Sequence, residues 1–167
     1  YYKMTPDKFT NVTNGIAHRR WLCQANPGLT EYLTKLIGKD FILEGSALEK
    51  LREYADDETV LADLEKIKFE NKKRFAAHIK KVQGIELDPN SIFDVQVKRL
   101  HEYKRQQLNL LYIIDKYFQI KDGDIPKRPI NFIFGAKAAP SYIMAKDIIH
   151  AILVMQKIIE TDREVNK

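Results

Sequence analysis

Two short apolar segments, each followed by a helical pattern, constrain the fold of this chain more than any other feature. Residues 92–97 have the composition of a short strand and follow a turn at 88–90. Residues 130–134 form a continuous apolar run, which is typical of a strand buried on both faces. Helical patterns begin near 103 and near 141. The order strand, helix, strand, helix predicts a parallel βαβα unit with a right-handed crossover.

The first half of the chain predicts helices. A short amphipathic helix is expected over 27–37, and a second short helix after Gly45. A longer helix is expected over about 58–82, because apolar residues recur there at helical spacing until Gly84 ends the pattern. The predicted fold class is therefore α/β, with the helices preceding the strands.

Two strands are too few for a parallel sheet that is stable by itself, since such a sheet needs several strands and cover on both faces. The chain starts with Tyr1 and ends on a polar Lys167. We therefore expect a fragment of a longer protein, or a sheet that is completed by another molecule. An exposed sheet edge could also pair two copies of the chain.

Composition excludes several classes of protein. Hydrophobic residues make up 44% and charged residues 31%, which excludes collagen-like and low-complexity chains. No apolar run approaches the roughly 18 residues of a spanning helix, and no secretion signal opens the chain, so no membrane partner is expected. Cys23 is the only cysteine, which excludes an internal disulfide and favours a cytoplasmic setting.

The segment that bears most on function is the basic stretch directly after the first predicted strand. Lys98, Arg99, Lys104 and Arg105 are expected to lie at the carboxyl end of that strand and in the first turn of the next helix. Cations at a helix N-terminus are unfavourable unless an anion joins them, and phosphate is the usual one. The net charge of +5 does not show which ligand, if any, this segment binds. Three interpretations stay open: a phosphate site, a nucleic-acid site, or a solvated basic segment.

The second strand-to-helix turn, residues 135–140, is rich in small residues. Gly135 would permit a close backbone approach, either to a ligand or to a neighbouring element. The turn is neither a dinucleotide fingerprint nor a P-loop, because the further glycines are missing. The four histidines have no metal-type spacing, so no metal site is expected.

Three motifs together resemble the α-glucan phosphorylases, the family of glycogen, starch and maltodextrin phosphorylases. They are Thr13-Asn14-Gly15-Ile16 with Arg19-Arg20-Trp21, the central stretch from Gln96 to Gln106, and Gly135 to Pro140. They occur in that family's order and at its approximate spacing. The resemblance extends over essentially the whole chain.

The resemblance implies an enzyme that cleaves a glucan at its non-reducing end with inorganic phosphate, giving α-glucose 1-phosphate with retained configuration. It implies a two-lobed glycosyltransferase of the B type, with pyridoxal phosphate as cofactor acting through its phosphate group, no metal, no nucleic-acid partner and a homodimer. Residues 1–21 would be an inter-lobe segment, and 22–167 the first part of a Rossmann-like C-terminal lobe, helical over 22–84 and βαβα over 90–160.

The resemblance also assigns roles to single residues. Arg99 and Lys104 resemble the ligands of the substrate phosphate, and Lys98 resembles a contact to the cofactor phosphate. Tyr103 and Asn14 resemble groups that hydrogen-bond the glucosyl unit. The basic stretch would then reduce the repulsion between two neighbouring phosphate groups.

His101, Glu102 and Tyr142 resemble positions of an entrance region that binds purine-like inhibitors in some members. Ser141 replaces a common glycine there, and Ala17-His18 replaces a common Thr-Pro. The segment that carries the Schiff-base lysine does not occur in these residues, so the chain by itself is expected to be inactive. The alternative is a basic binding module for nucleic acid or another anion without catalytic activity.

Overall fold

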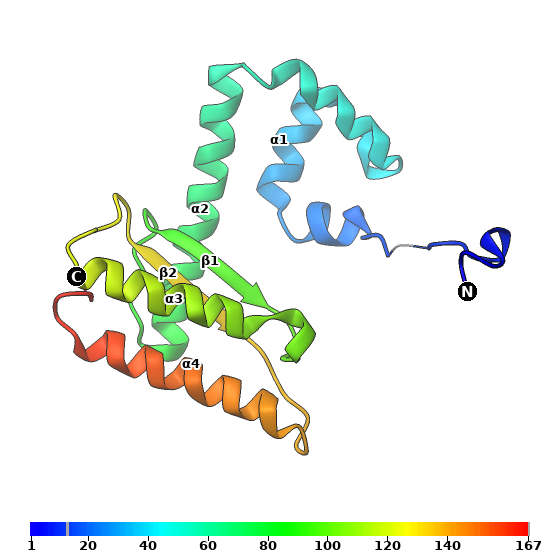
Figure 1. The fold of residues 1–167 in the computed structure, drawn as a ribbon. Coiled ribbons are helices and arrows are strands. Elements are labelled where there is room, and N and C mark those ends of the chain that lie inside the picture. The colour runs from blue at the N-terminus through cyan, green and yellow to red at the C-terminus, as the bar shows by residue number, and fades with distance from the viewer. Residues whose placement is uncertain (13, 167) are drawn as a thin grey trace. The chain divides into compact units, whose positions relative to one another are not determined.

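The computed structural model describes residues 1–12 and 14–166. The chain forms two compact units, residues 1–74 and 75–167, and the boundary falls within one long helix. In chain order the elements are η1 (Pro6–Lys8), η2 (Arg19–Gln24), α1 (Pro27–Ile37), η3 (Asp40–Ile42), η4 (Gly45–Tyr54), α2 (Glu58–Gln83), β1 (Ile92–Val97), η5 (Glu102–Lys104), α3 (Gln106–Lys121), β2 (Ile130–Gly135) and α4 (Ile143–Thr161) (Figure 1). No helix within the described ranges is long and apolar enough to cross a membrane.

Local capping explains the helices of the first unit. The Asn26 side chain accepts a hydrogen bond from the Leu29 N–H at 3.3 Å, and Gly38 ends α1 with a φ of 83°. Asp57 accepts from the backbone of Val60 at 3.1 Å in the first turn of α2. The helices predicted over 27–37 and 58–82 are therefore confirmed.

The short helix predicted after Gly45 exists, but it is a 3-10 helix. It is preceded by Glu44, whose carboxylate accepts hydrogen bonds from the Ser46 N–H at 3.3 Å and from the Ser46 hydroxyl at 2.9 Å. The first unit buries Phe41 completely and Leu33 almost completely. These two side chains form the best-shielded part of its apolar interior.

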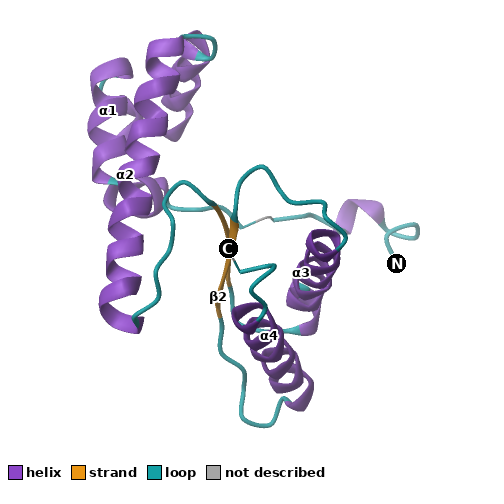
Figure 2. Ribbon diagram, turned by 90° about the vertical axis from the view of Figure 1, so that its left-hand side faces the viewer, coloured by secondary structure: helices purple, strands orange, loops and turns teal. Residues whose placement is uncertain are grey.

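The second unit contains the predicted strands, and they are parallel. The register pairs Ile92 with Ile130 at one end and Val97 with Gly135 at the other. Each strand is followed by a helix, so the element order is the predicted βαβα. In Figure 2 the helices α3 and α4 lie on the same side of the two strands.

The core of the second unit lies between the two helices and β2. Leu110 and Ile113 of α3 and Met155 of α4 are buried, and they pack against Phe132 and Phe134 of the strand. All residues of β2 are only half-buried, which differs from the burial on both faces that the sequence predicts. The difference arises because, among the described residues, β1 is the only strand beside β2, and α3 and α4 both cover the same face of the two strands (Figure 2).

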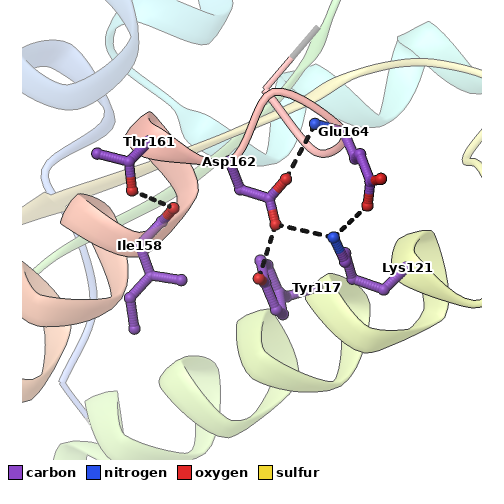
Figure 3. Close-up of polar contacts among 6 residues, drawn as sticks. All are labelled: Tyr117, Lys121, Ile158, Thr161, Asp162 and Glu164. Atoms are coloured by element: carbon purple, nitrogen blue, oxygen red, sulfur yellow. Dashed lines mark hydrogen bonds and ion pairs between the residues drawn. The ribbon is translucent and has the colours of Figure 1, made fainter.

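A polar cluster joins the C-terminal ends of α3 and α4 (Figure 3). The Tyr117 hydroxyl donates to Asp162 at 2.8 Å, and the Lys121 ammonium lies 3.2 Å from the same carboxylate. The backbone N–H of Glu164 also donates to Asp162 at 2.9 Å, and Lys121 pairs in addition with the Glu164 carboxylate. Beside it, the Thr161 hydroxyl donates to the backbone oxygen of Ile158 at 3.1 Å.

This cluster is expected to make stability depend on pH at the acid end. The Tyr117 hydroxyl, the Glu164 N–H and Lys121 together lower the pKa of Asp162 below its ordinary value. The stabilisation is therefore complete above the unfolded pKa of about 3.9 and is lost as the pH falls through the lower folded pKa. Urea unfolding of wild type and Asp162→Asn should show a difference in stability near neutrality that shrinks below about pH 4.

The matched control for that experiment is Asp147→Asn, which removes an exposed carboxylate of α4 outside the cluster. The difference between the free energies of unfolding of Asp147→Asn and wild type should change little over the same pH range. A difference between wild type and Asp162→Asn that stays constant down to about pH 2 would contradict the assigned cause.

Candidate active site

The basic turn, which we define as residues 98–105, connects β1 to α3. At its start, the backbone N–H of Lys98 donates to Gly135 at 3.0 Å and that of Leu100 donates to Lys137 at 3.1 Å. The Leu100 side chain is buried. The main-chain ladder therefore continues past the end of the sheet and fixes the first part of the basic turn beside the chain that leaves β2.

The second part of the basic turn is a separate 3-10 turn, which corrects the sequence prediction that its cations lie in the first turn of the helix. His101 is extended, and its ring nitrogen accepts from the backbone of Tyr103 at 3.4 Å. Arg105 has a φ of 60°, in the left-handed region, and α3 begins only at Gln106. This conformation interrupts the helical path, so the cations precede the N-terminus of α3.

The four cations of the basic turn form no ion pair with any carboxylate among the described residues. Lys98 and Arg99 are exposed, and Lys104 is half-buried. The Lys104 ammonium lies 5.8 Å from the centre of the Tyr103 ring. No carboxylate that the structure describes therefore pairs with this positive charge, and an anion bound there would be stabilised.

A buried glutamine reaches the basic turn from inside the second unit. Gln106 is completely buried, and its amide nitrogen donates to the backbone oxygens of Lys98 at 3.5 Å and Arg99 at 3.3 Å. Its amide oxygen Oε1 has no hydrogen-bond partner among the described residues. One side chain thus holds two consecutive carbonyl groups of the turn.

Two further amides hold the other end of the turn. Gln96 of β1 donates to the backbone oxygen of Lys104 at 3.2 Å, and Gln107 donates to that of Glu102 at 3.1 Å. Asn109 of α3 donates in turn to the Gln96 oxygen at 3.2 Å. We call Gln96, Gln106 and Gln107 the amide clamp.

Sequence reasoning missed the role of the amide clamp, although two of its members border the central motif. One signal was available. Gln106 lies four and seven residues before Leu110 and Ile113, so a polar side chain occupies the apolar stripe of α3. A glutamine at such a position has to bond to something inside the protein.

The side chains assigned to the entrance region do come together. The His101 ring centre lies 4.4 Å from that of Tyr103 and 5.1 Å from that of Tyr142. The Tyr142 hydroxyl donates to the Glu102 carboxylate and accepts from the Glu102 N–H at 3.3 Å. The hydrogen bond to Glu102, followed by burial, raises the pKa of Tyr142 above its ordinary value. This contact ties η5 to the start of α4.

The remaining site residue, Asn14, lies in the first unit and is exposed. Its role stays a prediction, and Thr13 of the same motif lies outside the described residues.

Gly135 permits a close approach of the neighbouring strand, because a Cβ atom there would lie 3.1 Å from the Val97 side chain. No group of three or more potential metal ligands occurs in the described part of the chain.

Comparison with known proteins places these features in a family. The sequence pattern of the carbohydrate phosphorylases matches residues 1–167, the whole chain. The chain belongs to the carbohydrate phosphorylase family. It is 54% identical over 165 residues to a maltodextrin phosphorylase of Streptococcus pneumoniae. This match covers 99% of this chain and 22% of that protein.

Animal phosphorylases are also similar to this phosphorylase segment. It is 46% identical over 168 residues to the muscle form of glycogen phosphorylase from Mus musculus, and 45% identical to that from Homo sapiens. Each match covers 99% of the chain and 20% of the relative. The segment therefore spans about a fifth of the length of its curated relatives, and the resemblance to α-glucan phosphorylases that its motifs indicate is confirmed.

Proposed function

We propose that the basic turn is the phosphate-binding part of an α-glucan phosphorylase active site. The full-length protein would transfer a terminal glucosyl unit of glycogen, starch or maltodextrin to inorganic phosphate, giving α-glucose 1-phosphate. The observation that carries this proposal is a turn whose four cations form no ion pair with a described carboxylate, in a chain that the carbohydrate phosphorylase pattern matches throughout.

Arg99 and Lys104 are the proposed ligands of the substrate phosphate. Arg99 is exposed at the end of the sheet, and its guanidinium can donate two parallel hydrogen bonds to phosphate oxygens. Lys104 adds a compact charge, and its partial burial strengthens its attraction to an anion. Their task is to bind the phosphate, orient it toward the glucan and stabilise the negative charge of the transition state.

The residues present fit a second phosphate group, that of pyridoxal phosphate. Lys98 follows β1 directly, is exposed and has no carboxylate partner among the described residues, so its ammonium can accept a further anion. We assign Lys98 to the cofactor phosphate. When bound, that group supplies an acid and base for the substrate phosphate. The four cations of the turn lower the cost of bringing two phosphates together.

The sugar side of the site involves Tyr103 and Asn14. Tyr103 is 70% exposed, so its hydroxyl is available to a ligand. We propose that both residues hydrogen-bond the glucosyl unit. The cluster of His101, Glu102 and Tyr142 offers aromatic faces beside a carboxylate, which suits a planar, purine-like inhibitor at the entrance.

The βαβα unit would belong to the Rossmann-like C-terminal lobe of a glycosyltransferase of the B type. Its open strand β2 supports a sheet that continues in the full-length protein, since parallel sheets have more than two strands. We further propose a cytoplasmic homodimer, in keeping with the single cysteine and with the resemblance of the motifs.

The activity can be tested directly. The full-length protein, incubated with a linear maltodextrin and inorganic phosphate, should form α-glucose 1-phosphate, measured by phosphorus NMR. No sugar phosphate at saturating concentrations of both substrates would contradict the proposal. Strong, steeply salt-dependent binding of single-stranded nucleic acid in the same preparation would instead favour a basic binding module.

A further inference from the structure

We propose that Gln106 is a positioning residue that keeps the peptide dipoles of Lys98 and Arg99 directed away from the bound phosphate. The inference rests on the proposed function, because it concerns the geometry of the same phosphate site. Gln106 itself does not touch the ligand, since its side chain is completely buried. It would act through the backbone of the two residues that carry the cations.

The hydrogen bonds of Gln106 have an unusual geometry for a chain that leaves a strand. Successive carbonyl groups of a strand point to opposite sides, so they cannot share a donor. Here one amide nitrogen lies 3.5 Å from the Lys98 oxygen and 3.3 Å from the Arg99 oxygen. Both carbonyls therefore point toward the interior, and the bonds fix the place where the chain departs from strand geometry.

This orientation matters to an anion because carbonyl oxygens carry partial negative charge. A carbonyl directed at a phosphate would offset part of the attraction of a nearby cation. Two further carbonyls of the turn are also engaged inside the protein: the His101 oxygen accepts from the Lys104 N–H at 2.9 Å, and the Glu102 oxygen accepts from the Arg105 N–H at 3.0 Å. Gln106 adds the Lys98 and Arg99 carbonyls, which accept no hydrogen bond from the turn's own backbone among the described residues, to the carbonyls that are held by hydrogen bonds within the protein.

The unpaired oxygen of Gln106 is a cost in stability that stands against the two hydrogen bonds donated by its amide nitrogen. A buried oxygen without a partner lowers stability, and rotating the amide by 180° would place Oε1 against two carbonyl oxygens. An apolar side chain of similar length would avoid this cost, because the neighbouring positions Leu110 and Ile113 are apolar. The benefit of the amide is then the geometry of the turn.

The test uses the full-length enzyme with the variants Gln106→Met and Gln106→Glu. Methionine keeps the length of the side chain and removes the donor. Glutamate replaces the donor by a charged acceptor that repels both carbonyls. We expect KM for phosphate to rise about tenfold in Gln106→Met, the loss of roughly one hydrogen bond, and further in Gln106→Glu, while KM for the glucan stays within about twofold.

The matched control is Gln156→Met, the same chemical change at an exposed glutamine of α4. It should leave both KM values unchanged. An unchanged KM for phosphate in the Gln106 variants would overturn the inference, and so would equal rises in both KM values together with a lower melting temperature. If Gln106→Met fails to fold, Gln106→Glu carries the same comparison. If the wild-type full-length protein shows no phosphorolysis activity, the proposed function is overturned, and the inference with it.

Discussion

Replacing Arg99 by alanine in the full-length phosphorylase should reduce kcat/KM for phosphate by about 10²- to 10³-fold. The guanidinium would contribute most in the transition state, where negative charge must be held in a fixed position. Because Arg99 is exposed and forms no ion pair with described residues, its removal should leave the melting temperature unchanged. Steady-state phosphorolysis with varied phosphate, together with thermal unfolding, measures both effects.

Two variants sharpen that experiment. Arg99→Lys keeps the charge and loses the paired donors, so its activity should fall between wild type and Arg99→Ala. Arg163→Ala removes an exposed arginine beyond the end of α4 and should behave as wild type. Activity of Arg99→Ala within about threefold of wild type would reject the assigned role of the guanidinium.

The largest expected effect on stability is that of Leu110→Ala. Leu110 is 8% exposed and lies in the core of the second unit with Ile113 and Met155. Removing its side chain leaves a cavity between α3, α4 and β2, at a cost of about 2–5 kcal/mol in the free energy of unfolding. Urea unfolding of the chain measures this difference.

The neighbouring Leu111 provides the control. It is 58% exposed on the same helix, so Leu111→Ala should change the free energy of unfolding by less than about 0.5 kcal/mol. Equal effects of the two substitutions would show that α3 does not bury the face that contains Leu110.

The secondary structure of this chain is largely encoded in local signals. Asn26 and Gly38 bound α1, and alternating or continuous apolar residues mark both strands, so these elements follow from the sequence. The residue at which α3 starts does not follow from these local signals. Its position depends on the left-handed Arg105 and on bonds from Gln96 to the turn, which the spacing of apolar residues does not encode.

Some features of the candidate site can likewise be predicted from the sequence, and others cannot. The charge of Lys98, Arg99 and Lys104 and their place after a strand are visible in the sequence, because they depend on residue types and order alone. The direction of the carbonyl groups is not visible, since it depends on which buried side chain donates to them. The half-burial of β2 likewise depends on which elements pack around it, and among the described residues its only neighbouring strand is β1.

Binding of phosphate by the basic turn can be observed in a crystal structure of the full-length enzyme with inorganic phosphate. We expect an anion whose oxygens lie about 2.7–3.1 Å from both the Arg99 guanidinium and the Lys104 ammonium. An ordered phosphate bound elsewhere in the active site, with these two side chains directed away from each other, would contradict this expectation.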